Sequence, residues 1–326
     1  MVQVDRFVGC ALARNVARQA RHLRGNPNCT ITQFPNGRRP WSFSARILSW
    51  AVSLALAVLV VVPSAHAVAV IGWNPAINLR FSSGSYEKGG LKENPHFILA
   101  GHDLSGIGWS PSNFGVTLIS PQHILTASHV APLAGEIVSF CNRDGVIKHY
   151  TVDSVYYVEH TARVRTELAL CRLTAPIPPE DHIGYFPTLR LPADTGYTGL
   201  KVFSFGQGQA CGNAVIARWG VFDLLPFNIH DHVADDTMFI MEWRHIDGEA
   251  QAQGGDSGSP TFALHHGQLA IVGVHSAVDV SKAPYLSADV LVPAYFDQIN
   301  GRLALDGFAF GNIFSASTAD KPHSSR

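Results

Sequence analysis

Cysteine is scarce in this chain of 326 residues, which has five of them. Cys10 and Cys29 lie near the N-terminus, so Cys141, Cys171 and Cys211 remain, and an odd number permits at most one internal bridge. This excludes a small scaffold held together by disulfides. Cys171 stands in the apolar run LALCRL, where we expect a buried free thiol.

Basic residues are also few once the N-terminal segment is set aside. Residues 1–67 hold eight arginines and one acid, whereas residues 68–326 hold 16 Lys and Arg against 24 Asp and Glu, a net charge of −8. A chain without a basic face lacks the surface that binds nucleic acid, so we expect no nucleic-acid partner.

Long apolar runs are limited to Ile47–Val62, an uncharged stretch of about 16 residues. A helix that crosses a bilayer needs roughly 20. Arginines precede the run, Pro63 ends it, and Ala65 and Ala67 form the A-x-A pattern of a signal-peptide cleavage site. We therefore expect residues 1–67 to be a leader with a signal peptide, and the protein to be secreted or periplasmic without stable membrane association. A retained anchor is the alternative.

Helical periodicity is nearly absent after residue 68. Short apolar runs, broken by Gly, Pro, Asn and Asp, alternate with polar residues in the manner of strands, as in GVTLIS, EIVSFC, HYTVDSVYYV and KVFSFGQG. Asn142–Gly145, NRDG, lies between two such runs and predicts a hairpin turn. Pro293–Gly301 begins with Pro and closes on Gly, as a short helix does. The pattern predicts an all-β sandwich or pair of barrels with a short C-terminal helix.

A Pro-rich stretch with little strand pattern, Thr174–Gly199, indicates a linker between two halves. We predict an N-terminal domain over residues 68–185, a C-terminal domain over residues 186–312, and a disordered tail over residues 313–326.

Ser257 stands in the glycine-rich stretch QAQGGDSGSP. Gly254, Gly255 and Gly258 let the backbone take positive φ and approach another group closely. A serine nucleophile needs an exposed Oγ and nearby backbone N–H groups aimed at a developing oxyanion. The alternative is an ordinary tight turn between strands.

Two further residues complete a catalytic pattern. His129 in LTASHV follows the small residues Ala127 and Ser128, which leave room for an imidazole in a cleft. Glu167 in RTELALCRL heads an apolar strand, where a carboxylate can orient an imidazole and stabilise its charged form. Taken singly, these residues are as well explained as a surface histidine and a solvated acid at a strand end.

Together, in the order His, acid, Ser, the three segments resemble the chymotrypsin/trypsin-like serine peptidase superfamily. LTASHV resembles that family's LTAAH, ELALCRL its DIALLRL, and GGDSGSP its GDSGGP. The resemblance spans roughly Pro95–Gly301 and implies two six-stranded antiparallel Greek-key barrels, the first with His129 and Glu167 and the second with Ser257. Missing flanking cysteines make it similar to bacterial members.

The resemblance also implies roles for these residues. Ser257 attacks the scissile carbonyl of a protein or peptide, His129 moves the proton, and the N–H groups of Gly255 and Ser257 form the oxyanion hole. The family's acid is normally Asp, and Glu167 is one methylene longer. Asp153 is the alternative acid, although TVDSVYY does not match the motif.

Three further positions correspond to substrate-binding residues of the family. Ser276 and its neighbours would pair with the substrate backbone. Gln251 stands where the trypsin branch has an acid, so we expect non-tryptic specificity. His275 resembles a histidine of the glutamyl endopeptidase branch, which predicts an acidic P1 residue. The alternative is a strand histidine bonded to its neighbours beside a pocket for small or apolar P1 residues.

Some alternatives remain open from the sequence. In the family, an aspartate directly before the serine can pair with a new N-terminal amine. Backbone N–H groups or a buried cation would also compensate the charge of Asp256. The chain can be a catalytically inactive homologue that binds peptides. His230–His232 and His265–His266 lack a third metal ligand at a recognisable spacing, so we expect no metal and no cofactor. We expect a monomer.

The leader generates a direct prediction. N-terminal sequencing of the exported protein should give Val68-Ala69-Val70, because cleavage after Ala67 follows the A-x-A pattern. A mature species that still contains Ile47–Val62 and pellets with membranes would indicate an anchor instead.

Overall fold

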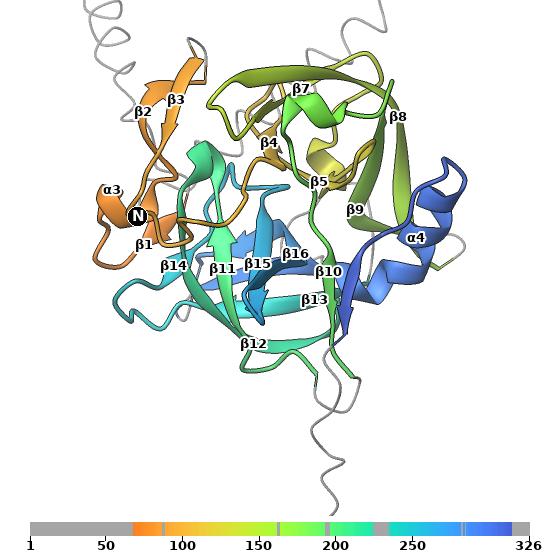
Figure 1. The fold of residues 1–326 in the computed structure, drawn as a ribbon. Helices are drawn as coiled ribbons and strands as arrows, with labels where there is room; N and C mark the ends of the chain where they lie inside the picture. Colours follow the sequence, from red (N-terminus) through yellow and green to blue (C-terminus); the bar gives the residue numbers. More distant parts are fainter. Residues whose placement is uncertain are drawn as a thin grey trace, which may run out of the picture. The chain divides into compact units, whose positions relative to one another are not determined.

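The computed structural model describes residues 68–86, 89–161, 164–192, 196–223, 235–281, 283 and 285–314 (Figure 1). The predicted leader and the pair His230–His232 lie outside the described residues. No helix in the described part of the chain is long and apolar enough to cross a membrane.

The first barrel is a closed ring of six antiparallel strands in the order β4–β5–β6–β9–β8–β7 (Figure 1). The strands are β4 (Ile107–Trp109), β5 (Gly115–Ser120), β6 (His123–Ala127), β7 (Ile137–Cys141), β8 (Ile147–Thr161) and β9 (Val164–Leu173). The predicted NRDG hairpin is confirmed between β7 and β8, where Gly145 takes a φ of 76°.

The second barrel lies within an eight-stranded sheet in the order β15–β11–β12–β13–β17–β16–β10–β18. An additional pairing of β15 with β16 closes six of these strands into a ring, and β10 pairs with β16 and β18 in parallel. The strands are β10 (Thr188–Arg190), β11 (Lys201–Phe205), β12 (Cys211–Asp223), β13 (Asp235–Glu242), β15 (Pro260–His265), β16 (Gln268–Asp279), β17 (Leu286–Leu291) and β18 (Asn312–Phe314).

The helix comes after the second barrel. A 3₁₀ turn, η6 (Val292–Tyr295), continues into α4 (Phe296–Ala304), which Figure 1 shows beside β8 and β9. The predicted all-β fold of two six-stranded barrels with a short C-terminal helix is therefore confirmed. The predicted end of the helix at Gly301 is wrong, because burial of Leu303 in the core keeps another turn helical.

Two segments in which we predict little or no strand structure contain a short strand each. Strand β10 interrupts the predicted linker Thr174–Gly199, as does a 3₁₀ turn, η3 (Pro179–Asp181). Ile313 and Phe314, the first residues of the predicted disordered tail, pair with β10 in strand β18, and the rest of that tail lies outside the described residues. In both places pairing to the second sheet orders a segment whose local sequence carries little strand signal.

The first described residues pack on the second half of the chain, whereas the hairpin that follows also contacts the first barrel, where the ring centroids of Tyr86 and Trp109 lie 4.5 Å apart. Strand β1 (Ala69–Val70) pairs antiparallel with β14 (Ala250–Gln251), and Val68 is buried with Ala210 and Ala250. Residues 68–70, which we predict within the N-terminal domain, are thus held by residues from the second half of the chain. The remaining N-terminal elements are α3 (Pro75–Asn78) and the hairpin of β2 (Phe81–Ser85) with β3 (Gly89–Glu93).

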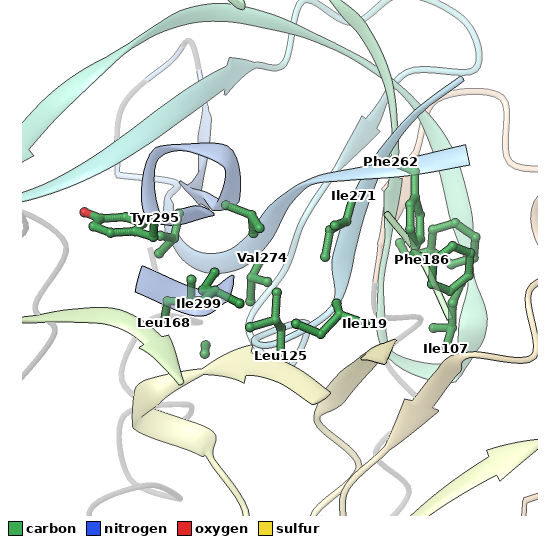
Figure 2. Close-up of a cluster of buried hydrophobic side chains, with 14 of the residues drawn as sticks. Ile107, Ile119, Leu125, Leu168, Phe186, Phe262, Ile271, Val274, Tyr295 and Ile299 are labelled. Carbon is green, nitrogen blue, oxygen red and sulfur yellow. The ribbon is translucent and has the colours of Figure 1, made fainter. Parts of the chain in front are cut away.

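Strands β5 and β6 are buried along their whole length. Because successive side chains point to opposite faces of a sheet, one face fills the first barrel and the other packs towards the second. Leu118 and Ile124 belong to the first barrel's own core, whereas Ile119 and Leu125 join a cluster with Ile271 and Val274 of the second barrel (Figure 2). This shared cluster places the end of β6 against the second barrel.

Cys141, Cys171 and Cys211 are free and buried. The prediction that Cys171 is a buried free thiol is confirmed, and burial raises its pKa.

Candidate active site

His129 lies just after strand β6, in the 3₁₀ turn η2 (Ser128–Val130). Strand β6 pairs with β9 in the register Ala127 to Leu168, which brings the following turn beside Glu167. The hydroxyl of Ser128 donates to the carbonyl oxygen of Thr166 at 3.0 Å and fixes the turn there. The imidazole stands at the surface with 30% of its side chain exposed.

Both ring nitrogens of His129 have a side-chain partner. Nδ1 lies 2.6 Å from Oε2 of Glu167, and Nε2 lies 2.9 Å from Oγ of Ser257. Glu167 is fully buried, whereas Ser257 is partly exposed. A carboxylate on Nδ1 fixes the tautomer in which Nε2 can accept the serine proton.

Glu167 uses its two oxygens unequally. Oε2 contacts the imidazole, and Oε1 is buried without a hydrogen-bond partner among the described residues. The backbone N–H of Glu167 donates to Oδ2 of Asp236 at 2.8 Å. Asp153 lies elsewhere, because its carboxylate binds the guanidinium of Arg172 at 2.5 Å. The structure therefore brings Glu167 to His129, and it does not bring Asp153 there.

The turn that carries Ser257 lies directly against the start of β5. Gly258 has a φ of 81°, and a Cβ there would meet both the carbonyl oxygen of Gly115 and Oγ1 of Thr126 at 2.3 Å. Gly115 itself donates its N–H to the carbonyl oxygen of Ser257 at 3.1 Å. Only glycine allows both the backbone conformation and this close approach.

The N–H groups of Gly255 and Ser257 were predicted to form an oxyanion hole. Gly255 has a φ of 114°. Neither N–H donates to an acceptor within the described residues, so both remain available to a bound oxyanion.

Asp256 is fully buried beside this turn. Its Oδ1 accepts from the N–H of Gln207 at 2.8 Å and its Oδ2 from the N–H of Gln253 at 2.7 Å. Burial raises the pKa of Asp256 to about 6, although nearby His275 opposes the shift. Val68 also packs here, because a Cβ on Gly206 would lie 2.3 Å from Val68 Cγ2 and 2.5 Å from Asp256 Oδ1.

The three residues predicted to bind substrate, Gln251, His275 and Ser276, are buried. His275 is 2% exposed, and its Nδ1 lies 3.0 Å from Oδ1 of Asp289 on the neighbouring strand β17. Gln251 in β14 is equally buried, and its Nε2 has no partner among the described residues. Ser276 lies at an irregularity in the pairing of β16 with β17, and its buried Oγ likewise has no partner in that part of the chain.

A sequence profile described as Trypsin matches residues 111–299. The chain belongs to the trypsin family. Membership of this family of chymotrypsin-like serine peptidases confirms the resemblance drawn from the three motifs, and it implies a peptidase acting on proteins. The match is to the family as a whole and assigns no branch within it. No curated protein matches the chain.

The sequence motifs do not mark Asp236 or Asp289 as residues of the site. Asp236 precedes the apolar run TMFIMEW and Asp289 interrupts SADVLV, and neither segment matches a catalytic motif. The one sequence signal for these two residues is an acidic residue within an apolar strand segment. This signal does not predict which residue the acid contacts.

The raised pKa of Asp256 predicts how stability depends on pH. The unfolded carboxyl loses its proton near its model value of 3.8, and the folded one near 6. Between these values the unfolded state binds fewer protons, so the free energy of unfolding falls as pH rises. The free energy of unfolding of wild type minus that of Asp256→Asn, measured by urea unfolding, should fall by about 2–3 kcal/mol between pH 4 and pH 7.

The same measurement can also contradict this prediction. A difference that stays flat or rises with pH would mean that a cation compensates the ionised Asp256 carboxylate. The α-amine of a chain that begins at Val68 would be such a cation, so species with and without the leader should be compared.

Proposed function

We propose that this trypsin-family protein is a secreted serine endopeptidase that works through Ser257, His129 and Glu167. The observation that carries the proposal is the pair of contacts on one imidazole, with Glu167 Oε2 at 2.6 Å and Ser257 Oγ at 2.9 Å. A nucleophile, a base and an orienting carboxylate in this sequence of contacts form the arrangement that activates a serine.

The reaction follows from this arrangement in two stages. In the first, Ser257 Oγ bonds to the scissile carbonyl carbon while His129 takes the hydroxyl proton, and the N–H groups of Gly255 and Ser257 stabilise the oxyanion. The C–N bond then breaks, and His129 gives the proton to the leaving amine. In the second stage, water attacks the acyl carbon while His129 takes a proton from it. The bond between this carbon and Ser257 Oγ then breaks, His129 returns the proton to Oγ, and the carboxylic acid product leaves.

The charge of Glu167 supports the step in which His129 becomes an imidazolium. Glu167 is fully buried, so its interaction with the imidazolium is weakly screened by water. The longer side chain of Glu still reaches Nδ1 at 2.6 Å. Export follows from the leader, and with it the expectation of a protein or peptide substrate outside the cytoplasm.

A catalytically inactive, peptide-binding homologue is the competing function. The contact between His129 and Ser257 and the free N–H groups of Gly255 and Ser257 favour the enzyme, because a binding module needs none of them. Labelling with a fluorophosphonate probe separates the two, since only an activated serine reacts.

For the P1 residue we propose a small or apolar side chain. Gln251 carries no charge to attract a basic side chain. His275 is buried and its Nδ1 is engaged by Asp289 at 3.0 Å, so the imidazole offers an acidic side chain little exposed surface. Ala252 is fully buried and offers no hydroxyl to such a group.

The catalytic assignment is tested by single and double substitutions. Ser257→Ala should lower the peptidase rate by several orders of magnitude, and adding His129→Ala should cost little more, because the members of a triad act as a unit. Glu167→Gln should lower the rate by roughly 10²–10⁴. Far-ultraviolet circular dichroism of each variant controls for folding. Full activity in Ser257→Ala would refute the mechanism.

Specificity is tested by cleavage-site profiling of the mature protein on a peptide library. Small or apolar P1 residues should be enriched and Lys or Arg depleted. Enrichment of Glu or Asp would contradict the proposed pocket and assign the P1 carboxylate to His275. In that event His275→Ala should remove cleavage after Glu while sparing cleavage after Ala or Leu.

A further inference from the structure

The backbone of Glu167 lies at a break in its own strand ladder. Strand β9 pairs with β8 at Ala169 with Tyr157 and at Arg165 with Glu159, and the register shifts between these pairs. The N–H of Glu167 therefore has no acceptor on β8. A buried N–H needs a partner, and a side chain from the other barrel provides it.

That partner is the carboxylate of Asp236 on strand β13. Its Oδ2 accepts from the N–H of Glu167 at 2.8 Å, and the whole residue is excluded from solvent. Strand β9 belongs to the first barrel and β13 to the second. The bond therefore ties the residue beside His129 to the barrel that carries Ser257.

The other oxygen of Asp236 is held as firmly. Oδ1 accepts from the hydroxyl of Tyr295 in η6, and that hydroxyl accepts in turn from the N–H of Thr237 at 3.0 Å. Nδ1 of His160 on β8 lies 3.3 Å from the same tyrosine oxygen. Asp236 is thus oriented by donors on both sides before it meets Glu167.

The position of the Glu167 carboxylate depends more on its backbone than it would if both carboxylate oxygens had hydrogen-bond partners. Its Oε1 has no partner among the described residues, so only His129 holds the end of this side chain. The extra methylene relative to Asp adds a rotatable bond between backbone and carboxylate. The position of the carboxylate is then set by where its backbone starts.

We propose that Asp236 is a positioning residue for the catalytic acid, which fixes the backbone of Glu167 so that its carboxylate meets Nδ1 of His129. The inference rests on the proposed function and deepens it, since it names a residue that acts only through Glu167.

Charge is secondary in this role. Burial raises the pKa of Asp236 to about 7, and the neighbouring Glu167 carboxylate adds to the shift. The ionisable groups that face Asp236 are Glu167 from β9 and Tyr295 from η6, with His160 from β8 behind the tyrosine. An uncharged carboxyl still accepts from the Glu167 N–H through its carbonyl oxygen. The amide of Asn can do the same.

The test is a double-mutant cycle on the full mature protein with a fluorogenic peptide taken from the cleavage-site library. Asp236→Ala should lower kcat roughly 10- to 100-fold, below the loss from Glu167→Gln, and leave KM nearly unchanged. In the Glu167→Gln background, Asp236→Ala should change kcat less than threefold. Asp236→Asn should recover most of the wild-type kcat.

Two further variants guard the interpretation. If Asp236→Ala does not fold, Tyr295→Phe removes only a hydroxyl, and its smaller loss of kcat should likewise vanish in the Glu167→Gln background. Asp153→Asn is the control. Asp153 also lies in the first barrel, but its carboxylate pairs with Arg172 at the surface, so its removal should leave kcat and KM unchanged.

The outcomes separate this inference from the proposed function. Equal losses from Asp236 substitution in both Glu167 backgrounds would overturn the positioning role and leave the triad intact, as would equal losses from Asn and Ala. A Glu167→Gln variant with wild-type kcat would overturn the triad, and the positioning role with it.

Discussion

The site depends on one close contact between the two barrels, where the turn around Ser257 rests on the beginning of β5. The N–H of Gly115 donates to the carbonyl oxygen of Ser257, and Gly258 leaves no space for a side chain against Gly115. Strand β5 also pairs with β6, which leads into His129. One backbone contact thus fixes the nucleophile relative to the strand pair that carries the base.

Electrostatics at this junction are unusual because several acids are fully buried there, among them Glu167, Asp236 and Asp256. Each has a different compensation. Glu167 faces the imidazole, Asp236 takes a tyrosine hydroxyl and a backbone N–H, and Asp256 takes two backbone N–H groups. Hydrogen bonds to the charged form offset part of the desolvation cost, and the raised pKa values of Asp236 and Asp256 show that the offset is incomplete.

The sequence was sufficient for the fold class and for the family, because the strand periodicity and the segments around His129, Glu167 and Ser257 are local signals. It could not reveal the ordering of β10 and β18, whose few residues are held by pairing to distant strands. The role of Asp236 could not be predicted for the same reason, since its partners Glu167 and Tyr295 are 69 and 59 residues away in the sequence. The environment of His275 likewise depends on Asp289 across the sheet.

The pairing of β1 with β14 determines where a useful fragment of this protein can begin. The family match starts at residue 111, but Arg80, Phe97 and Leu99 are buried upstream of it, and Ala69 pairs with Gln251 six residues before Ser257. A fragment cut to the family match would lose that pairing and expose these contacts. The unit of folding is therefore longer at its N-terminal end than the unit of sequence similarity, and expression boundaries should be placed no later than Val68.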